Sequence, residues 1–154
     1  MNYVTDDTMN AYLRSVQPMY DGVLGEIQKE AIAAEVPIVP PEVARLLSVL
    51  LTMQKPKNIL EIGTAVAFSA GLMCRYLPEE GTVTTIDRYE VMLKDARVNI
   101  KRMGLEDKIK ILEGDAADIL PDAALDGTLI LLGMGYAFLG LAIGYVKYQR
   151  KDIY

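Results

Sequence analysis

Histidine is absent from this chain, and cysteine is almost absent. The lack of histidine excludes Ser-His-Asp and Cys-His catalysis and any metal site built on histidine. The single cysteine, Cys74, cannot form an intramolecular disulfide and fits a reducing compartment, and we interpret it as a small thiol of the core or of a helix. Acid–base chemistry is therefore left to carboxylates, lysine and tyrosine.

An excess of positive charge is also lacking. The formal net charge of -5 argues against broad attraction to nucleic-acid phosphates, although a local patch could still bind RNA. The first 14 residues hold no apolar run of the kind a signal peptide needs, so we expect a cytoplasmic protein. With 154 residues, 51% of them hydrophobic and 24% charged, the chain fits one globular domain.

The pattern of apolar residues predicts alternating helices and strands. Two helices are expected between residues 6 and 34, with a break at Pro18. Residues 36–41 contain three prolines, which predicts an extended segment, and Pro41 begins another helix. Three short strands, 58–62, 82–86 and 108–112, then alternate with helices over about 67–76 and 89–103. This order predicts a Rossmann-like α/β fold, a mostly parallel sheet with helices on both faces.

The ends of the three predicted strands hold the candidate binding residues, because ligands bind at the carboxyl edge of an open parallel sheet. Gly63 permits a tight turn after the first strand, and the following helix presents free backbone N–H groups. Asp87 is placed to accept hydrogen bonds from two ribose hydroxyls, and Asp115 from the amino group of adenine. Each residue alone is also typical of a turn or a helix cap, but the three in order favour a nucleoside site.

The first turn favours one class of nucleoside over another. A dinucleotide site needs G-x-G-x-x-G, whereas residues 63–68 contain one glycine. Glu61, just before the turn, would repel a pyrophosphate, but it is suited to hold an ammonium group directly or through water. The charge pattern therefore predicts a nucleoside with a cationic tail, such as S-adenosylmethionine (SAM).

Several segments together resemble a known family. They are Val36–Val39 with Pro41–Val43, Leu60–Ala65 with Ser69-Ala70, Val83–Asp87, Asn99-Ile100 with Gly104-Leu105, and Gly114–Ala116. From about Tyr20 to Leu120 the chain resembles the class I SAM-dependent O-methyltransferases, the small bacterial relatives of catechol O-methyltransferase. Within these it is most similar to the tRNA 5-hydroxyuridine methyltransferases.

This resemblance implies a function and a set of cofactor contacts. The implied reaction transfers a methyl group from SAM to a hydroxyl oxygen of a tRNA or of a small hydroxylated acceptor. The resemblance implies that seven residues contact SAM, and we add the turn residue Thr64. The predicted cofactor-binding residues are Val39, Glu61, Gly63, Thr64, Ser69, Asp87, Asp115 and Ala116. The chain departs from the family where Ala67-Phe68-Ser69 replaces Gly-Tyr-Ser, which crowds the loop, and where Asp87 replaces a more common Glu.

The family also implies a divalent metal such as Mg²⁺, held by an Asp-Ala pair that ends the fourth strand and by a later Asp-Asn pair. After the third strand nothing in this chain matches either pair at its place in the family pattern, so we predict no metal ligand, and the catalytic residues stay unknown. We divide the chain into residues 1–127, the N-terminal helices with the SAM-binding half, and an atypical apolar tail, 128–154. The fold is therefore expected to be shortened at its C-terminal end.

Three interpretations of the tail stay open. Residues 128–146 lack charge over 19 positions, which is long enough to span a membrane, but that topology would place the SAM site outside the cell. Alternatively, 128–132 is a fourth strand of a shortened fold, or truncation or an altered reading frame has replaced the catalytic half.

A half sheet exposes apolar surface and an edge, so we expect a homo-oligomer. The alternative function is a non-catalytic SAM-binding or membrane-associated module.

Overall fold

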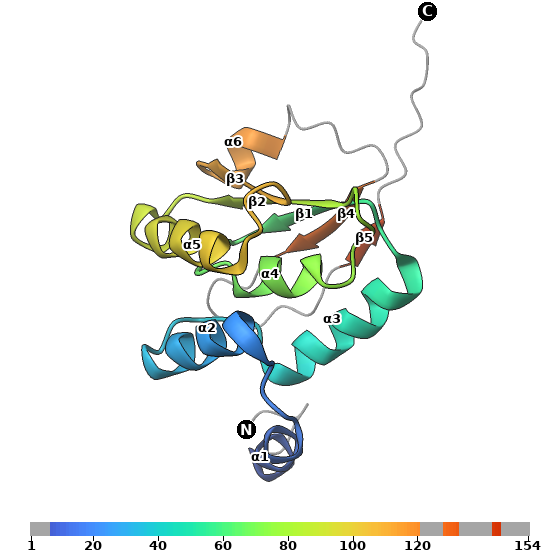
Figure 1. The fold of residues 1–154 in the computed structure, drawn as a ribbon, viewed down its shortest axis with the longest axis vertical. Helices are drawn as coiled ribbons and strands as arrows, with labels where there is room; N and C mark the ends of the chain where they lie inside the picture. The colour runs from blue at the N-terminus through green and yellow to red at the C-terminus, as the bar shows by residue number, and fades with distance from the viewer. Residues whose placement is uncertain (1–6, 121–127, 133–142, 146–154) are drawn as a thin grey trace, which may run out of the picture.

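The computed structural model describes residues 7–120, 128–132 and 143–145. It contains six helices and five strands within these ranges (Figure 1). In chain order they are α1 (Asp7–Val16), α2 (Gly22–Ala33), α3 (Pro41–Gln54), β1 (Asn58–Ile62), α4 (Phe68–Cys74), β2 (Thr82–Asp87), α5 (Glu90–Met103), β3 (Ile109–Glu113), α6 (Ala116–Ile119), β4 (Thr128–Leu132) and β5 (Ile143–Tyr145).

The strands form one sheet in the order β3-β2-β1-β4-β5. The first four strands are parallel, and β5 pairs antiparallel with β4. Ile62 at the end of β1 lies beside Ile86 of β2 and Leu132 of β4, so the carboxyl ends of these strands meet at one edge. The predicted Rossmann-like, mostly parallel α/β fold is confirmed, and residues 128–132 form the fourth strand that one interpretation of the tail expected.

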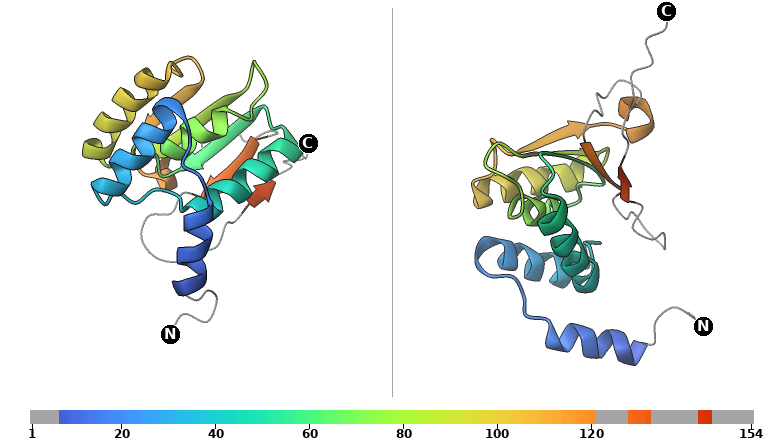
Figure 2. Two further views of the ribbon diagram at one scale, coloured as in Figure 1. Left: turned by 60° about the horizontal axis from the view of Figure 1, so that its bottom comes forward. Right: turned by 90° about the vertical axis from the view of Figure 1, so that its right-hand side faces the viewer.

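The sheet is covered chiefly on one side. Helices α3, α4 and α5 lie there, with α2 packed outside them, while the short α6 lies on the other side (Figures 1 and 2). Alternate strand residues point into the covered side, where Ile59, Val83 and Ile109 pack in one buried cluster with Met73 and Cys74 of α4. Burial raises the pKa of the Cys74 thiol to about 11, which is consistent with a core thiol rather than a reactive one.

A second apolar cluster joins the N-terminal helices to α4. Leu24 and Ile27 of α2 pack there with Phe68 at the start of α4. The ring of Tyr20 meets Phe68 edge to face at 5.9 Å, and the guanidinium of Arg45 lies 4.8 Å from the centre of the Tyr20 ring. This cluster fixes the proline-rich segment before α3, which borders the carboxyl edge of the sheet.

The apolar tail is described only in part. Residues 128–132 and 143–145 are strands of the same sheet, and 133–142 lie outside the described residues. Within the ranges that the structure describes, no helix has the length and apolar character needed to cross a bilayer.

The end of α3 allows a test of this local structure. Lys55 caps the helix in the left-handed conformation, with φ 45° and ψ 54°, and its side chain is exposed. Glycine adopts this conformation without the steric cost that a Cβ imposes, so we expect Lys55→Gly to raise the free energy of unfolding by about 0.5–1 kcal/mol. Urea unfolding measures the change. Lys55→Ala is the matched control, because it removes the same side chain and keeps the Cβ; an equal gain in that variant would contradict the explanation.

Candidate functional site

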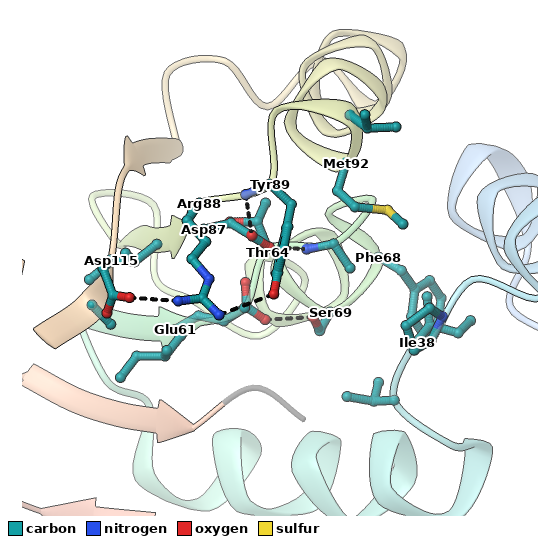
Figure 3. Close-up of a pocket in the computed structure, with 18 of the residues that line it drawn as sticks. Ile38, Glu61, Thr64, Phe68, Ser69, Asp87, Arg88, Tyr89, Met92 and Asp115 are labelled. Carbon is teal, nitrogen blue, oxygen red and sulfur yellow. Dashed lines mark hydrogen bonds and ion pairs between the residues drawn. The ribbon is translucent and has the colours of Figure 1, made fainter. Parts of the chain in front are cut away.

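A cavity of about 850 Å³ opens at the carboxyl edge of the sheet. Its walls come from the ends of β1, β2 and β3, the segment before α3, and the first turns of α4 and α5 (Figure 3). All eight residues that the sequence predicted to bind the cofactor line this one cavity: Val39, Glu61, Gly63, Thr64, Ser69, Asp87, Asp115 and Ala116. The parallel strands thus bring together residues that lie up to 77 positions apart (116 minus 39).

Glu61 is the most deeply buried charged group of the cavity, with 3% of the residue exposed. The hydroxyl of Ser69 donates to its Oε1 at 2.5 Å, and the hydroxyl of Thr85 donates to its Oε2 at 2.7 Å. The hydroxyl oxygens of Thr64 and Thr85 lie 2.8 Å apart. A hydroxyl has one proton, and Thr85 donates its own to Glu61, so Thr64 is the donor in this second bond. A chain of hydroxyl groups from three elements therefore supports this carboxylate.

Burial changes the ionisation of Glu61. The pKa of Glu61 is raised from 4.5 to about 7, chiefly by loss of hydration and to a smaller extent by the nearby charge of Asp87, against the lowering effect of the bonds from Ser69 and Thr85. The folded state therefore binds this proton more tightly than the unfolded state does. The contribution of Glu61 to the free energy of unfolding is therefore fully present below pH 4.5 and is lost as the pH rises through about 7. The shift in pKa corresponds to about 3 kcal/mol. A cation beside Glu61 would remove this cost.

Asp87 closes the turn that follows β1. Its Oδ2 accepts a hydrogen bond from the N–H of Ala65 at 3.0 Å, and its Oδ1 accepts one from the N–H of Tyr89 at 3.0 Å. The turn itself begins at Gly63, whose φ of 99° favours glycine. Each carboxylate oxygen has a second lone pair, so Asp87 can still accept bonds from two ligand hydroxyls.

The loop where the sequence departs from the family it resembles adopts an uncommon conformation. Ala65 and Ala67 both have positive φ, 44° and 62°, and Ala67 is fully buried at the start of α4. Glycine, the usual family residue at position 67, adopts such angles without a Cβ penalty. The next residue, Phe68, is 1% exposed, and its ring packs in the core cluster with Tyr20 while it also borders the cavity.

Asp115 serves as a helix cap as well as a wall of the cavity. Its Oδ1 accepts from the N–H of Ala117 at 3.0 Å, and its Oδ2 accepts from Arg88 Nη1 at 2.7 Å. The bond from Ala117, together with that from Arg88, holds the pKa of Asp115 below its usual value. The other end of the Arg88 guanidinium donates to the hydroxyl of Tyr89 at 3.1 Å, so Arg88 lies between Tyr89 and Asp115 (Figure 3).

Sequence reasoning missed Arg88, Tyr89 and Met92 among the residues that line the cavity. The first two directly follow the strand-end residue Asp87, and that position was the signal that could have found them. The opposite wall is apolar and comes from the segment before α3 and from α3 itself, with Ile38, Val39, Val43 and Leu47. One side of the cavity therefore offers carboxylates and backbone donors, and the other offers an apolar surface.

Comparison with known proteins agrees with this architecture. The sequence profile of the O-methyltransferase family matches residues 15–150. A catechol O-methyltransferase of Niastella koreensis is 30% identical over 129 residues, which are 82% of this chain and 58% of that protein. A catechol O-methyltransferase of Mycobacterium tuberculosis is 30% identical over 118 residues, 75% of this chain and 54% of that protein.

Solved structures show the same likeness. The O-methyltransferase of Bacillus cereus, crystallised in complex with S-adenosylhomocysteine (SAH), superimposes with a TM-score of 0.68 and 30% identity, covering 81% of this chain and 60% of that one. The chain thus spans between half and two thirds of the length of these relatives. The family match over most of its residues shows that the chain belongs to the O-methyltransferase family, among the class I SAM-dependent enzymes similar to catechol O-methyltransferase.

Proposed function

We propose that the cavity binds SAM and that the protein transfers the methyl group of SAM to a hydroxyl oxygen. The observation that carries this proposal is the pair of carboxylates, Glu61 and Asp87, that line one cavity from the ends of adjacent strands. Asp87 retains lone pairs for ribose hydroxyls, and Glu61 is a buried carboxyl group whose partners among the described residues are neutral hydroxyl groups. SAM offers both the hydroxyls and the cation.

The other cavity residues suit the remaining parts of SAM. Asp115 and Ala116 border the end where adenine would lie, and Ser69 supports Glu61 at the end where the ammonium group would lie. The apolar wall around Val39 would exclude water from the sulfonium. Methyl transfer from SAM is an in-line displacement, so this chain's contribution is to hold the donor in place and to keep the site dry.

The acceptor, the location and the assembly are part of the proposal. The names of the catechol and caffeoyl-CoA O-methyltransferase relatives support a small hydroxylated acceptor. The alternative acceptor, 5-hydroxyuridine in tRNA, rests on the sequence resemblance alone. We also propose a cytoplasmic homo-oligomer, in which residues 1–127 form the N-terminal helices and the SAM-binding half, and residues 128–154 form an atypical extension of the same domain.

Isothermal titration calorimetry tests the proposal. We expect SAM and SAH to bind with one molecule per chain and NAD not to bind, because the turn at Gly63 holds a single glycine and Glu61 repels a pyrophosphate. Transfer of labelled methyl groups to 5-hydroxyuridine tRNA and to catechols then tests the reaction. Binding without transfer to any acceptor would support a non-catalytic SAM-binding module instead, and NAD binding without SAM binding would contradict the proposal.

A further inference from the structure

The metal site that the family resemblance implies begins at the end of the fourth strand, and β4 is that strand here. Its register is parallel to β1, with Leu132 beside Ile62, so β4 ends at the same edge as the cavity. From Thr128 to Tyr148 the sequence contains no Asp, Glu, Asn, Gln, His or Cys. The strand end that would supply metal-binding carboxylates therefore supplies leucine and glycine.

Four carboxylates line the cavity: Glu90 is exposed at the start of α5, and the other three, Glu61, Asp87 and Asp115, already accept hydrogen bonds within the protein. Both oxygens of Glu61 accept bonds from hydroxyl groups, and both oxygens of Asp87 accept bonds from backbone N–H groups. Asp115 is held by a backbone N–H and by the Arg88 guanidinium, a cation that would repel a metal ion. Among the described residues, no three carboxylate, histidine or cysteine side chains are grouped so that they could hold a metal ion. In the part of the chain that the structure describes, the residues do not fit the divalent metal that the family implies.

We infer that this cavity takes its cofactor without a divalent metal ion, and that the acceptors it can serve are hydroxyl compounds already ionised near neutral pH. The inference rests on the proposed function. In the transfer step the acceptor oxyanion attacks the methyl carbon, the carbon–sulfur bond breaks, and its electron pair passes to sulfur, which gives a methyl ether and SAH. The acceptor proton must leave for solvent beforehand.

The restriction on the acceptor follows from acid–base equilibrium. A phenol with a pKa near that of tyrosine, about 10, is ionised in about one molecule per thousand at neutral pH. Without a cation to lower that pKa, such an acceptor offers few oxyanions to the methyl group. A nitrophenol, which is ionised near neutral pH, offers several hundredfold more. We therefore expect transfer to a nitrophenol, unchanged by magnesium, and little transfer to phenol or catechol. Transfer that depends on magnesium, or none to the nitrophenol, would overturn the acceptor part of the inference.

Cofactor binding provides the test that needs no turnover. SAH is titrated into the full chain in EDTA and again in excess Mg²⁺, and Mn²⁺ is titrated alone and with SAH present. We expect the two SAH dissociation constants to agree within about twofold and Mn²⁺ to show no stoichiometric binding. A tenfold or greater tightening by Mg²⁺, or one Mn²⁺ per chain, would overturn the inference while leaving the proposed function standing. A chain that binds neither SAM nor SAH in any of these conditions would instead contradict the proposed function.

Discussion

We expect Asp87→Asn to weaken the binding of SAH by about a hundredfold or more, which corresponds to about 3 kcal/mol. The carboxylate receives backbone N–H groups on both oxygens and still has room for two ribose hydroxyls. In asparagine one oxygen becomes an NH₂ group, which faces an N–H donor and cannot accept a bond from a hydroxyl. Hydrogen bonds to a charged group contribute about 1.5–3 kcal/mol each, so the loss of one or two accounts for the expected effect.

Calorimetry with SAH measures this loss, and thermal unfolding verifies that the variant is folded. Asp95→Asn is the matched control, since Asp95 is an exposed residue of α5 that does not line the cavity. It should bind SAH as the unaltered protein does. If Asp87→Asn folds and its affinity falls less than about threefold, Asp87 does not hold the ribose.

The affinity for SAH should fall about tenfold between about pH 8 and about pH 6, because Glu61 must be ionised to hold the ammonium group of the ligand. The pKa of Glu61 in the free protein is raised to about 7 by burial, so Glu61 is ionised above this pH and binds a proton below it. Below pH 7 each binding event must first release that proton. Affinity is therefore full above the raised pKa and is lost as the pH falls through it.

Two variants test whether Glu61 is the group responsible. Glu61→Gln cannot ionise, so it should bind SAH more weakly at about pH 8 and with an affinity that no longer changes with pH. Glu90→Gln removes a carboxylate that lines the same cavity but is exposed, and it should keep the pH profile of the unaltered protein. A slope that persists in Glu61→Gln would assign the titration to another group.

Much of the sheet and of the cavity could be predicted because both depend on short-range patterns. Apolar runs such as Asn58–Ile62 predict strands, and a turn residue or an acid marks each strand end. Once the strands are parallel, topology alone brings those ends to one edge. The convergence of Glu61, Asp87 and Asp115 on one cavity follows from these rules without any knowledge of side-chain contacts.

Other features could not be predicted, either because they depend on which residues face each other in the folded sheet or because one sequence pattern suits several structures. The bond between Thr85 and Glu61 requires that these two residues be direct partners across β1 and β2. The position of Arg88 between Tyr89 and Asp115 requires the start of α6 to lie near the end of β2. The tail was ambiguous because an uncharged apolar run suits a buried strand, a buried helix and a membrane span alike.

The left-handed alanines of the loop after β1 have a consequence for the kinetics of binding. Ala65 and Ala67 adopt conformations that cost about 1–2 kcal/mol each; Ala65 is held by the hydrogen bond from its N–H to Asp87, and Ala67 by complete burial. A loop fixed by its surroundings in this way already has its shape before a ligand arrives, so binding has little chain ordering left to perform. We therefore expect cofactor association to be a single-step encounter, whose observed rate rises in proportion to ligand concentration without the plateau of a preceding rearrangement.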